Sequence, residues 1–261
     1  MKQEQIKFQS NNKTVVGIIE TPDHGEIFPL VILFHGGTNT KDKFPTYPII
    51  RDRLIEEGFM TFRIDFFGSG ESDGEFKDKT NAFMLNNMKD AIDFIVRDER
   101  VEKFGIFTRS QSSLQSSYLI DDRISARVMC CPAIRPWDCF TNVWYPKEMK
   151  EFLKTSDDYL FIKTSDVRKV KGEYGYSRKY FNELQALPKK TEESMPKMNN
   201  VMIIQGEMDK EINYMDAVTA FNYLPSGNRE LHMISGVGHP FEGKENEVAS
   251  YAVSWFNKYL K

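Results

Sequence analysis

Short apolar runs alternate along the chain with longer stretches in which apolar residues recur at helical spacing. Residues 30–34 (LVILF) are apolar throughout, as expected for a strand that is buried on both faces of a sheet. Between residues 81 and 97, apolar side chains recur every three or four positions, which predicts an amphipathic helix. Further strands are expected at 14–20, 60–66, 104–108, 124–131, 201–205 and 230–234, and further helices at 47–57, from 110, at 214–223 and at 246–260.

Strands that alternate with helices predict an α/β fold, in which a mostly parallel central sheet carries helices on both faces. Residues 134–197 break this alternation and contain no run of the LVILF kind. We expect them to form an inserted lid over the carboxyl edge of the sheet, where open α/β sheets bind ligands. Residues 1–133 and 198–261 would then form the core domain.

The expected insertion is rich in aromatic residues. Eleven of them lie between Trp137 and Phe181, about 24% of that stretch against 13% of the whole chain. Trp137, Trp144 and Tyr145 are the expected substrate-binding residues, because they lie nearest in sequence to the end of the preceding strand. Residues 174–181 are expected to form a lid helix. The alternative is that the aromatic residues only pack the insertion on itself.

Composition and charge narrow the classes of function. The 261 residues, of which 40% are hydrophobic, suffice for one large α/β domain. The 35 basic and 38 acidic residues give a net charge of −3, which lacks the basic footprint of a nucleic-acid-binding protein. No apolar run approaches the ~18 residues of a membrane span, and the first residues show no secretory signal. We therefore expect a cytoplasmic protein that acts on a small molecule; no pattern indicates its oligomeric state.

Cysteine and histidine residues give no sign of a disulfide framework or a metal centre. The three cysteines, Cys130, Cys131 and Cys139, are odd in number and irregularly spaced, so we expect small buried side chains in a reducing compartment. The four histidines are dispersed and do not have the spacing of zinc ligands.

Ser110 is the candidate nucleophile, because it lies where the expected strand 104–108 runs directly into a helix. Such a turn exposes the serine Oγ and points the next backbone N–H at the developing oxyanion. The usual pattern is G-x-S-x-G, whereas Thr108 and Ser112 flank the serine here. Both are small, although Thr108 is β-branched. Taken alone, Ser110 also fits an ordinary helix N-cap.

A carboxylate and an imidazole follow the last two expected strands. Asp209 lies in GEMD after VMIIQ, and His239 lies in GVGHP after LHMIS. The order serine, aspartate, histidine is that of the α/β-hydrolase fold. In such a triad His239 takes the proton of the Ser110 hydroxyl, and Asp209 fixes the tautomer of the imidazole.

Two further turns follow expected strands. Residues 35–38 (HGGT) contain glycines that let a backbone N–H approach an oxyanion, and His35 is expected to make structural hydrogen bonds. Residues 65–74 (DFFGSGESDG) match neither glycine-rich phosphate-binding motif. We expect a shaped loop there, in which Asp65 binds local backbone groups.

Together, HGGTNTKDKF, FRIDFFGSGESDGEF, the turn at Ser110, GEMD and GVGHPF resemble the serine hydrolases of the α/β-hydrolase superfamily, particularly the cinnamoyl and feruloyl esterase group. The resemblance implies cleavage of carboxylic esters through an acyl-enzyme, without a cofactor. It also implies a small lid at 134–197, the triad Ser110, Asp209 and His239, and oxyanion donors at the backbone N–H groups of Gly37 and Gln111.

The turn at Ser110 departs from this group, which usually shows G-H-S-Q-G-G where this chain has TRSQSS. Two alternatives therefore stay open. An acyl thioesterase or acyltransferase would use the same triad on a thioester or a different acceptor. A binding protein on the same fold would have lost efficient chemistry.

Overall fold

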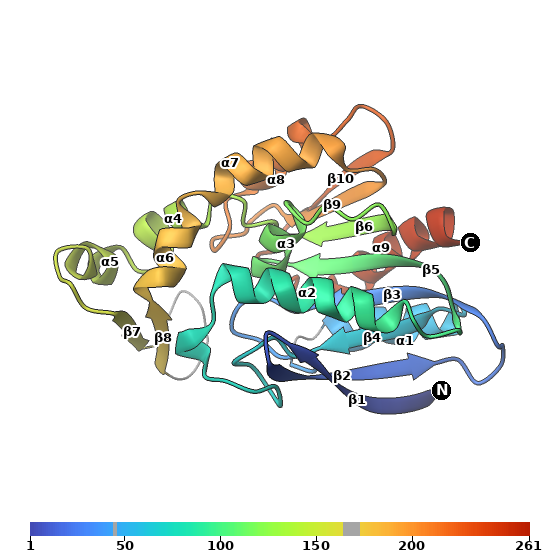
Figure 1. Ribbon diagram of the computed structural model, residues 1–261. Helices are drawn as coiled ribbons and strands as arrows, with labels where there is room; N and C mark the ends of the chain where they lie inside the picture. Colours follow the sequence, from blue (N-terminus) through green and yellow to red (C-terminus); the bar gives the residue numbers. More distant parts are fainter. Residues whose placement is uncertain (44–45, 164–172) are drawn as a thin grey trace.

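The computed structural model describes residues 1–43, 46–163 and 173–261, and Figure 1 shows how their elements are arranged. An eight-stranded sheet has the order β1-β2-β4-β3-β5-β6-β9-β10. From β4 to β10 neighbouring strands run parallel, whereas β2 is antiparallel to both β1 and β4. These strands are β1 (Lys2–Ser10), β2 (Lys13–Thr21), β3 (Phe28–Phe34), β4 (Met60–Ile64), β5 (Val101–Arg109), β6 (Ile124–Cys130), β9 (Val201–Gly206) and β10 (Arg229–Ile234).

Helices cover both faces of the sheet, as the sequence predicts. On one face α1 (Thr46–Glu56) and α9 (Glu245–Leu260) pack in the same cluster as Val31 and Leu33 of β3. On the other face α2 (Asn81–Ile95) packs in the same cluster as Leu30 and Ile32. Successive side chains of a strand point to opposite faces, so the apolar run of β3 is buried on both. The expected α/β class with a mostly parallel sheet is confirmed.

Two shorter helices complete the second face. The helix α3 (Gln111–Ser116) follows β5 directly, and α8 (Tyr214–Tyr223) packs in a cluster with Met129 and Ile203. A single 3-10 turn, η1 (Phe76–Asp78), precedes α2. No helix within the described ranges is long and apolar enough to cross a membrane.

The antiparallel edge strand β1 was not expected from the sequence. Most of its side chains are exposed, and only Phe8 and Ser10 are buried. A strand that buries so few residues carries no clear alternation, so its place in the sheet comes from its full-length pairing with β2.

The stretch 134–197 contains several short elements: α4 (Pro136–Asp138), the π-helical turn η2 (Cys139–Trp144), α5 (Pro146–Phe152), β7 (Tyr159–Lys163), β8 (Glu173–Ser177), α6 (Arg178–Leu184), α7 (Leu187–Ser194) and η3 (Met195–Lys197). Residues 164–172 of the expected insertion lie outside the described ranges. Most of the described aromatic residues form a cluster with Leu114, Ala133 and Ile212 of the core. In Figure 1 most of these elements lie at the end of the sheet toward which β5 and β6 point.

This stretch also contains an antiparallel pair of strands, β7 and β8, which the sequence did not indicate and in which Leu160 and Ile162 are buried. One expectation for the stretch is wrong. Residues 174–181 are not one helix, because β8 occupies the first part and α6 begins only at Arg178. Ser177 caps α6 by accepting a hydrogen bond from the backbone N–H of Tyr180 (3.1 Å).

Candidate active site

Ser110 occupies a strained turn between β5 and α3. Its φ of 53° and ψ of −116° lie in a region that non-glycine residues rarely adopt. The backbone N–H of Ser110 donates to the carbonyl oxygen of Cys130 (2.8 Å), so the β5–β6 pairing continues into the turn. The residue is only 4% exposed. The chain therefore makes the abrupt strand-to-helix turn that the sequence predicts.

Hydroxyl groups fill the positions where the usual motif has glycine. Thr108 and Ser112 are both fully buried. Thr108 Oγ1 donates to the carbonyl oxygen of Val128 (3.2 Å). Ser112 Oγ donates to the carbonyl oxygen of Phe34 (2.8 Å) and accepts from the backbone N–H of Arg109 (2.8 Å). Because both hydroxyls bind backbone atoms, the turn accommodates these side chains without leaving their polar atoms unsatisfied.

Asp209 and His239 form a directed pair. His239 Nδ1 donates to Asp209 Oδ2 (2.8 Å), which also accepts from Gln205 Nε2 (3.0 Å). Asp209 Oδ1 accepts from the backbone N–H groups of Glu211 (2.8 Å) and Ile212 (2.9 Å). Burial acts to raise the pKa of Asp209, but His239 and the two backbone donors outweigh it and hold that pKa below its ordinary value. The carboxylate is thus ionised and fixed in orientation near neutral pH.

The loop that carries His239 is fastened to the turn that carries Ser110. Arg109 Nη2 donates to the backbone carbonyl oxygen of His239 (2.8 Å). His239, like Ser110, is almost fully buried, with 6% of its surface exposed. Within the described residues the Ser110 hydroxyl has no hydrogen-bond partner.

Asp216 is a second buried carboxylate, and its partner is not His239. Arg135 Nε donates to Asp216 Oδ1 (2.7 Å), and the two side chains form an ion pair. The carboxylate that holds His239 is therefore that of Asp209.

Gly37 and Gln111 lie beside Ser110 with their backbone N–H groups available. Neither N–H donates to any other group in the part of the chain that the structure describes. A Cβ at Gly37 would lie 2.5 Å from Gln111 Oε1, so a larger residue there would require the Gln111 side chain to move. Lys79 Nζ donates to the carbonyl oxygen of Gly37 (2.8 Å), and Gln111 Nε2 donates to Tyr180 Oη (2.6 Å), so both residues are held in place.

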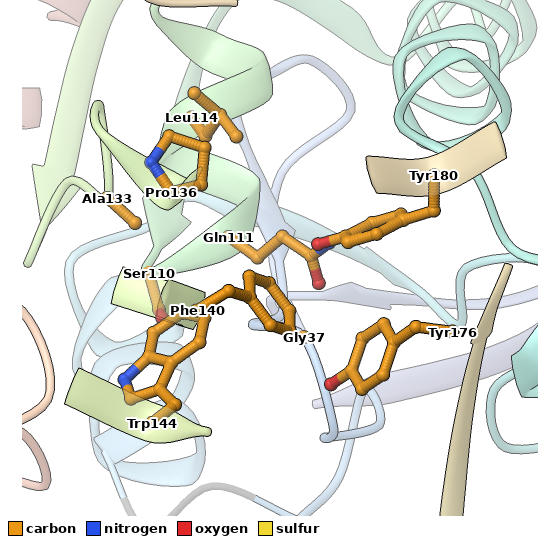
Figure 2. Close-up of a pocket in the computed structure, with 10 residues that line it drawn as sticks. All are labelled: Gly37, Ser110, Gln111, Leu114, Ala133, Pro136, Phe140, Trp144, Tyr176 and Tyr180. Carbon is orange, nitrogen blue, oxygen red and sulfur yellow. The ribbon is translucent and has the colours of Figure 1, made fainter. Parts of the chain in front are cut away.

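A pocket opens onto these residues, and Figure 2 shows its lining. The lining consists of Gly37, Ser110, Gln111, Leu114, Ala133, Pro136, Phe140, Trp144, Tyr176 and Tyr180. Its volume is about 10 Å³, close to the ~10–15 Å³ that one water molecule needs. Aromatic rings thus fill most of the space, and a larger group requires them to shift.

Of the three expected substrate-binding residues, only Trp144 lines this pocket. Trp137 packs its ring edge against Phe181 (6.5 Å between ring centroids), and Tyr145 packs against Phe140 (6.0 Å). The pocket is also lined by residues that the sequence did not indicate, among them Pro136, Phe140, Tyr176 and Tyr180. Pro136, Phe140 and Trp144 are four residues apart, a spacing that marks one face of a helical segment, whereas Tyr176 lies in β8 and Tyr180 in α6.

His35 has the structural role that the sequence indicates. Its Nδ1 donates to the carbonyl oxygen of Gly36 (2.7 Å), and its Nε2 accepts from the backbone N–H of Phe66 (3.1 Å). Burial, with the nearby positive charge of Lys79, lowers the pKa of His35 to about 4. The ring is therefore neutral at pH 7 and has both nitrogens occupied.

The turn 65–74 is a shaped loop, as expected. Asp65 Oδ1 accepts from the backbone N–H of Lys41 (2.8 Å), and Asp65 Oδ2 accepts from that of Glu71 (3.0 Å) and from Lys41 Nζ (2.7 Å). The loop after β3 is thereby tied to the loop after β4.

One group of side chains near the site has the atom types of metal ligands. The ligand atoms of Cys131, Asp209 and His239 lie within 4.8 Å of one another. However, His239 and Asp209 are hydrogen-bonded to each other. Burial, with the charge of Asp209, raises the pKa of the Cys131 thiol well above its ordinary value. A protonated thiol is a poor ligand, so this arrangement does not favour a metal. All three cysteines are free and buried, as expected.

The chain is similar to solved structures in its fold, although its sequence identity to them is low. No family model and no curated protein matches the chain. Est1E from Butyrivibrio proteoclasticus, solved with ferulic acid, superposes with a TM-score of 0.80 over 97% of this chain and 98% of its own, at 20% identity.

Two further structures have the same overall architecture. The alpha/beta hydrolase GrgF from Penicillium sp. sh18 gives a TM-score of 0.81 over 100% and 99% of the two chains, at 16% identity. The esterase domain of a Rhodothermus marinus protein gives 0.75 over 100% of each, at 13% identity. The chain thus has the α/β-hydrolase fold, as its sequence motifs predict.

Proposed function

We propose that the protein is a serine hydrolase that cleaves carboxylic esters through an acyl-enzyme. One observation carries the proposal: the strained Ser110 turn opens onto a pocket between two available backbone N–H groups, those of Gly37 and Gln111. The directed pair of Asp209 and His239, fastened to the same turn, supplies the matching base.

The proposed reaction follows from these groups. His239 uses Nδ1 to bind Asp209, so its Nε2 takes the proton as Ser110 Oγ attacks the ester carbonyl carbon. The backbone N–H groups of Gly37 and Gln111 stabilise the oxyanion. His239 then gives the proton to the leaving alkoxide, which leaves an acyl group on Ser110. Water, deprotonated by His239, attacks this acyl-enzyme and releases the carboxylic acid.

The pocket favours an uncharged acyl group. None of its described lining residues carries a charged side chain, and Phe140, Trp144, Tyr176 and Tyr180 present rings to it. Removing apolar acyl surface from water there stabilises the complex. The ferulic acid in Est1E is an aromatic acid, which supports an apolar or aromatic acyl group in this protein also.

The test is labelling with a fluorophosphonate, which reacts with activated serines. The wild-type protein should be labelled stoichiometrically and Ser110→Ala should not, while the control Ser250→Ala, on the exposed surface of α9, should label normally. Labelling that persists in Ser110→Ala contradicts the assignment. Absence of both labelling and turnover favours a binding protein.

A panel of nitrophenyl esters and acyl thioesters, each with and without an added alcohol acceptor, identifies the reaction. Faster cleavage of the oxygen esters, with water as the acceptor, is expected. A preference for thioesters, or for the alcohol over water, favours the thioesterase or acyltransferase alternative.

A further inference from the structure

A second, larger cavity lies at the opposite edge of the sheet from Ser110. Its volume is about 240 Å³, many times the ~10–15 Å³ that one water molecule needs. It is lined by Ile120, Asp121, Asp122, Ile124, Arg127, Lys197, Met198 and Asn199. Most of these residues directly precede β6 and β9, whereas Ser110 follows the parallel strand β5. We call this cavity the Arg127 pocket.

Arg127 is a buried cation that forms no ion pair with a carboxylate of the described residues. Its side chain is only 3% exposed. Nη2 donates to the carbonyl oxygen of Leu119 (2.9 Å), and Nη1 lies 3.5 Å from both the carbonyl oxygen and Oγ of Ser116. Within residues 1–43, 46–163 and 173–261, it forms no ion pair. Burial lowers the pKa of Arg127 to about 10, although the charge of Asp121 acts in the opposite direction.

The other charged residues that line the pocket do not offset the positive charge of Arg127. Asp121 is already paired with Arg123, whose Nη2 lies 2.7 Å from its Oδ2 and whose Nε donates to its Oδ1 (2.9 Å). Lys197 is exposed and forms no ion pair with a described residue. Asp122 is the one lining acid without such a pair in the described chain. Among the described residues, the lining thus has two cations without an ion pair, Arg127 and Lys197, and one carboxylate without an ion pair, Asp122.

We propose that the Arg127 pocket binds a small oxyanion, a phosphate or a carboxylate, which pairs with the Arg127 guanidinium and is held at the rim by Lys197. The planar fork of an arginine matches either group with two parallel hydrogen bonds. Leaving a buried charge uncompensated is unfavourable, and a bound anion relieves that cost. The site is separate from Ser110 and does not depend on the proposed esterase activity.

The test is thermal unfolding of the full chain in increasing inorganic phosphate or acetate, with sodium chloride keeping the ionic strength constant. Calorimetric titration with the same two salts gives the affinities. A ligand that binds only the folded state raises Tm with the logarithm of its concentration. We expect at least one of the two anions to do so in the wild-type protein, and their relative affinities separate a phosphate site from a carboxylate site.

Variants locate the binding. Lys197→Glu should weaken the binding by ~10-fold or more, about the value of one charge-assisted hydrogen bond. Lys189→Glu is the matched control, because Lys189 is an exposed lysine of α7 outside the pocket, and it should bind as the wild type does. Arg127→Gln should abolish the binding; if that variant fails to fold, the two lysine variants decide.

Three results would overturn the proposal. The first is that neither anion shifts Tm beyond the effect of chloride. The second is that Lys197→Glu and Lys189→Glu bind equally well. The third is that the Tm rise persists in folded Arg127→Gln.

Discussion

Replacing Asp209 by asparagine changes one heavy atom and should remove the base. Asp209 Oδ1 accepts two backbone N–H groups, from Glu211 and Ile212, so the amide oxygen must stay at that position. The amide nitrogen then faces His239 Nδ1, which has to give up its proton in order to accept. The remaining proton of the neutral imidazole moves to Nε2, the atom that should accept the proton of Ser110.

The expected loss is large. The corresponding asparagine variant of a Ser-His-Asp protease loses ~10⁴ in kcat through the wrong tautomer. At ~1.4 kcal/mol per factor of ten this is about 5.5 kcal/mol of transition-state stabilisation. The donor Gln205 Nε2, 3.0 Å from Oδ2, adds to the conflict, because it would also face the amide nitrogen. We therefore expect kcat on a nitrophenyl ester to fall by ~10³–10⁴.

The matched control is Asp216→Asn, which changes a second buried carboxylate that pairs with Arg135 rather than with His239. It should lower Tm but leave kcat within a few-fold of the wild-type value. If Asp209→Asn keeps kcat within ~10-fold of wild type, or if Asp216→Asn loses as much, the reasoning is wrong.

Trp144→Ala should change the kcat/KM ratio between bulky and small esters by ~10-fold or more, since one pocket contact is worth ~1–3 kcal/mol. Trp137→Ala, outside the lining, should leave that ratio unchanged, and equal effects would contradict the pocket assignment. His35 has its pKa lowered from 6.5 to about 4, so only the unfolded chain gains this proton as pH falls between those values. The free energy of unfolding should therefore decrease by up to ~3 kcal/mol over that window, and an identical slope in His35→Gln would refute this. Gly70 has a φ of +53°, and a Cβ there would clash with the buried carboxylate of Asp65, so Gly70→Ala should lower Tm. Gly227→Ala, with nothing within 4 Å, should not, and similar shifts would count against the steric argument.

The parts of the fold that the sequence predicts are those with strong periodicity. β3 is apolar at nearly every position because both of its faces are buried, so its composition alone identifies it. β1 has no such signature, because its pairing with β2 is made by backbone groups that any sequence supplies. β8 carries a glycine between two tyrosines, and its pairing with β7, 14 residues earlier in the chain, is not readable from local pattern.

The candidate triad could be predicted because it depends on topology more than on packing. Carboxyl ends of parallel strands meet at one edge of a sheet, so Ser110, Asp209 and His239 are brought to the same edge once β5, β9 and β10 are recognised. The pocket lining depends instead on the direction of each side chain. Nearness in sequence to the end of β6 favours Trp137 and Tyr145, yet the helical turns of the segment point both away from the lining.

Two roles are open to the aromatic residues of the stretch 134–197, lining the pocket and packing on one another, and Phe140 has both. It lines the pocket while its ring contacts those of Trp144, Tyr176 and Tyr180, at centroid distances of 4.8, 5.0 and 5.8 Å. Rings packed at this density cannot move singly, because a shift of one removes contacts from its neighbours. The small volume of the pocket and the stability of the aromatic cluster are therefore coupled. If this pocket holds the acyl group, as proposed, a bulky acyl group must displace several rings together, so selectivity against such groups belongs to the cluster as a whole.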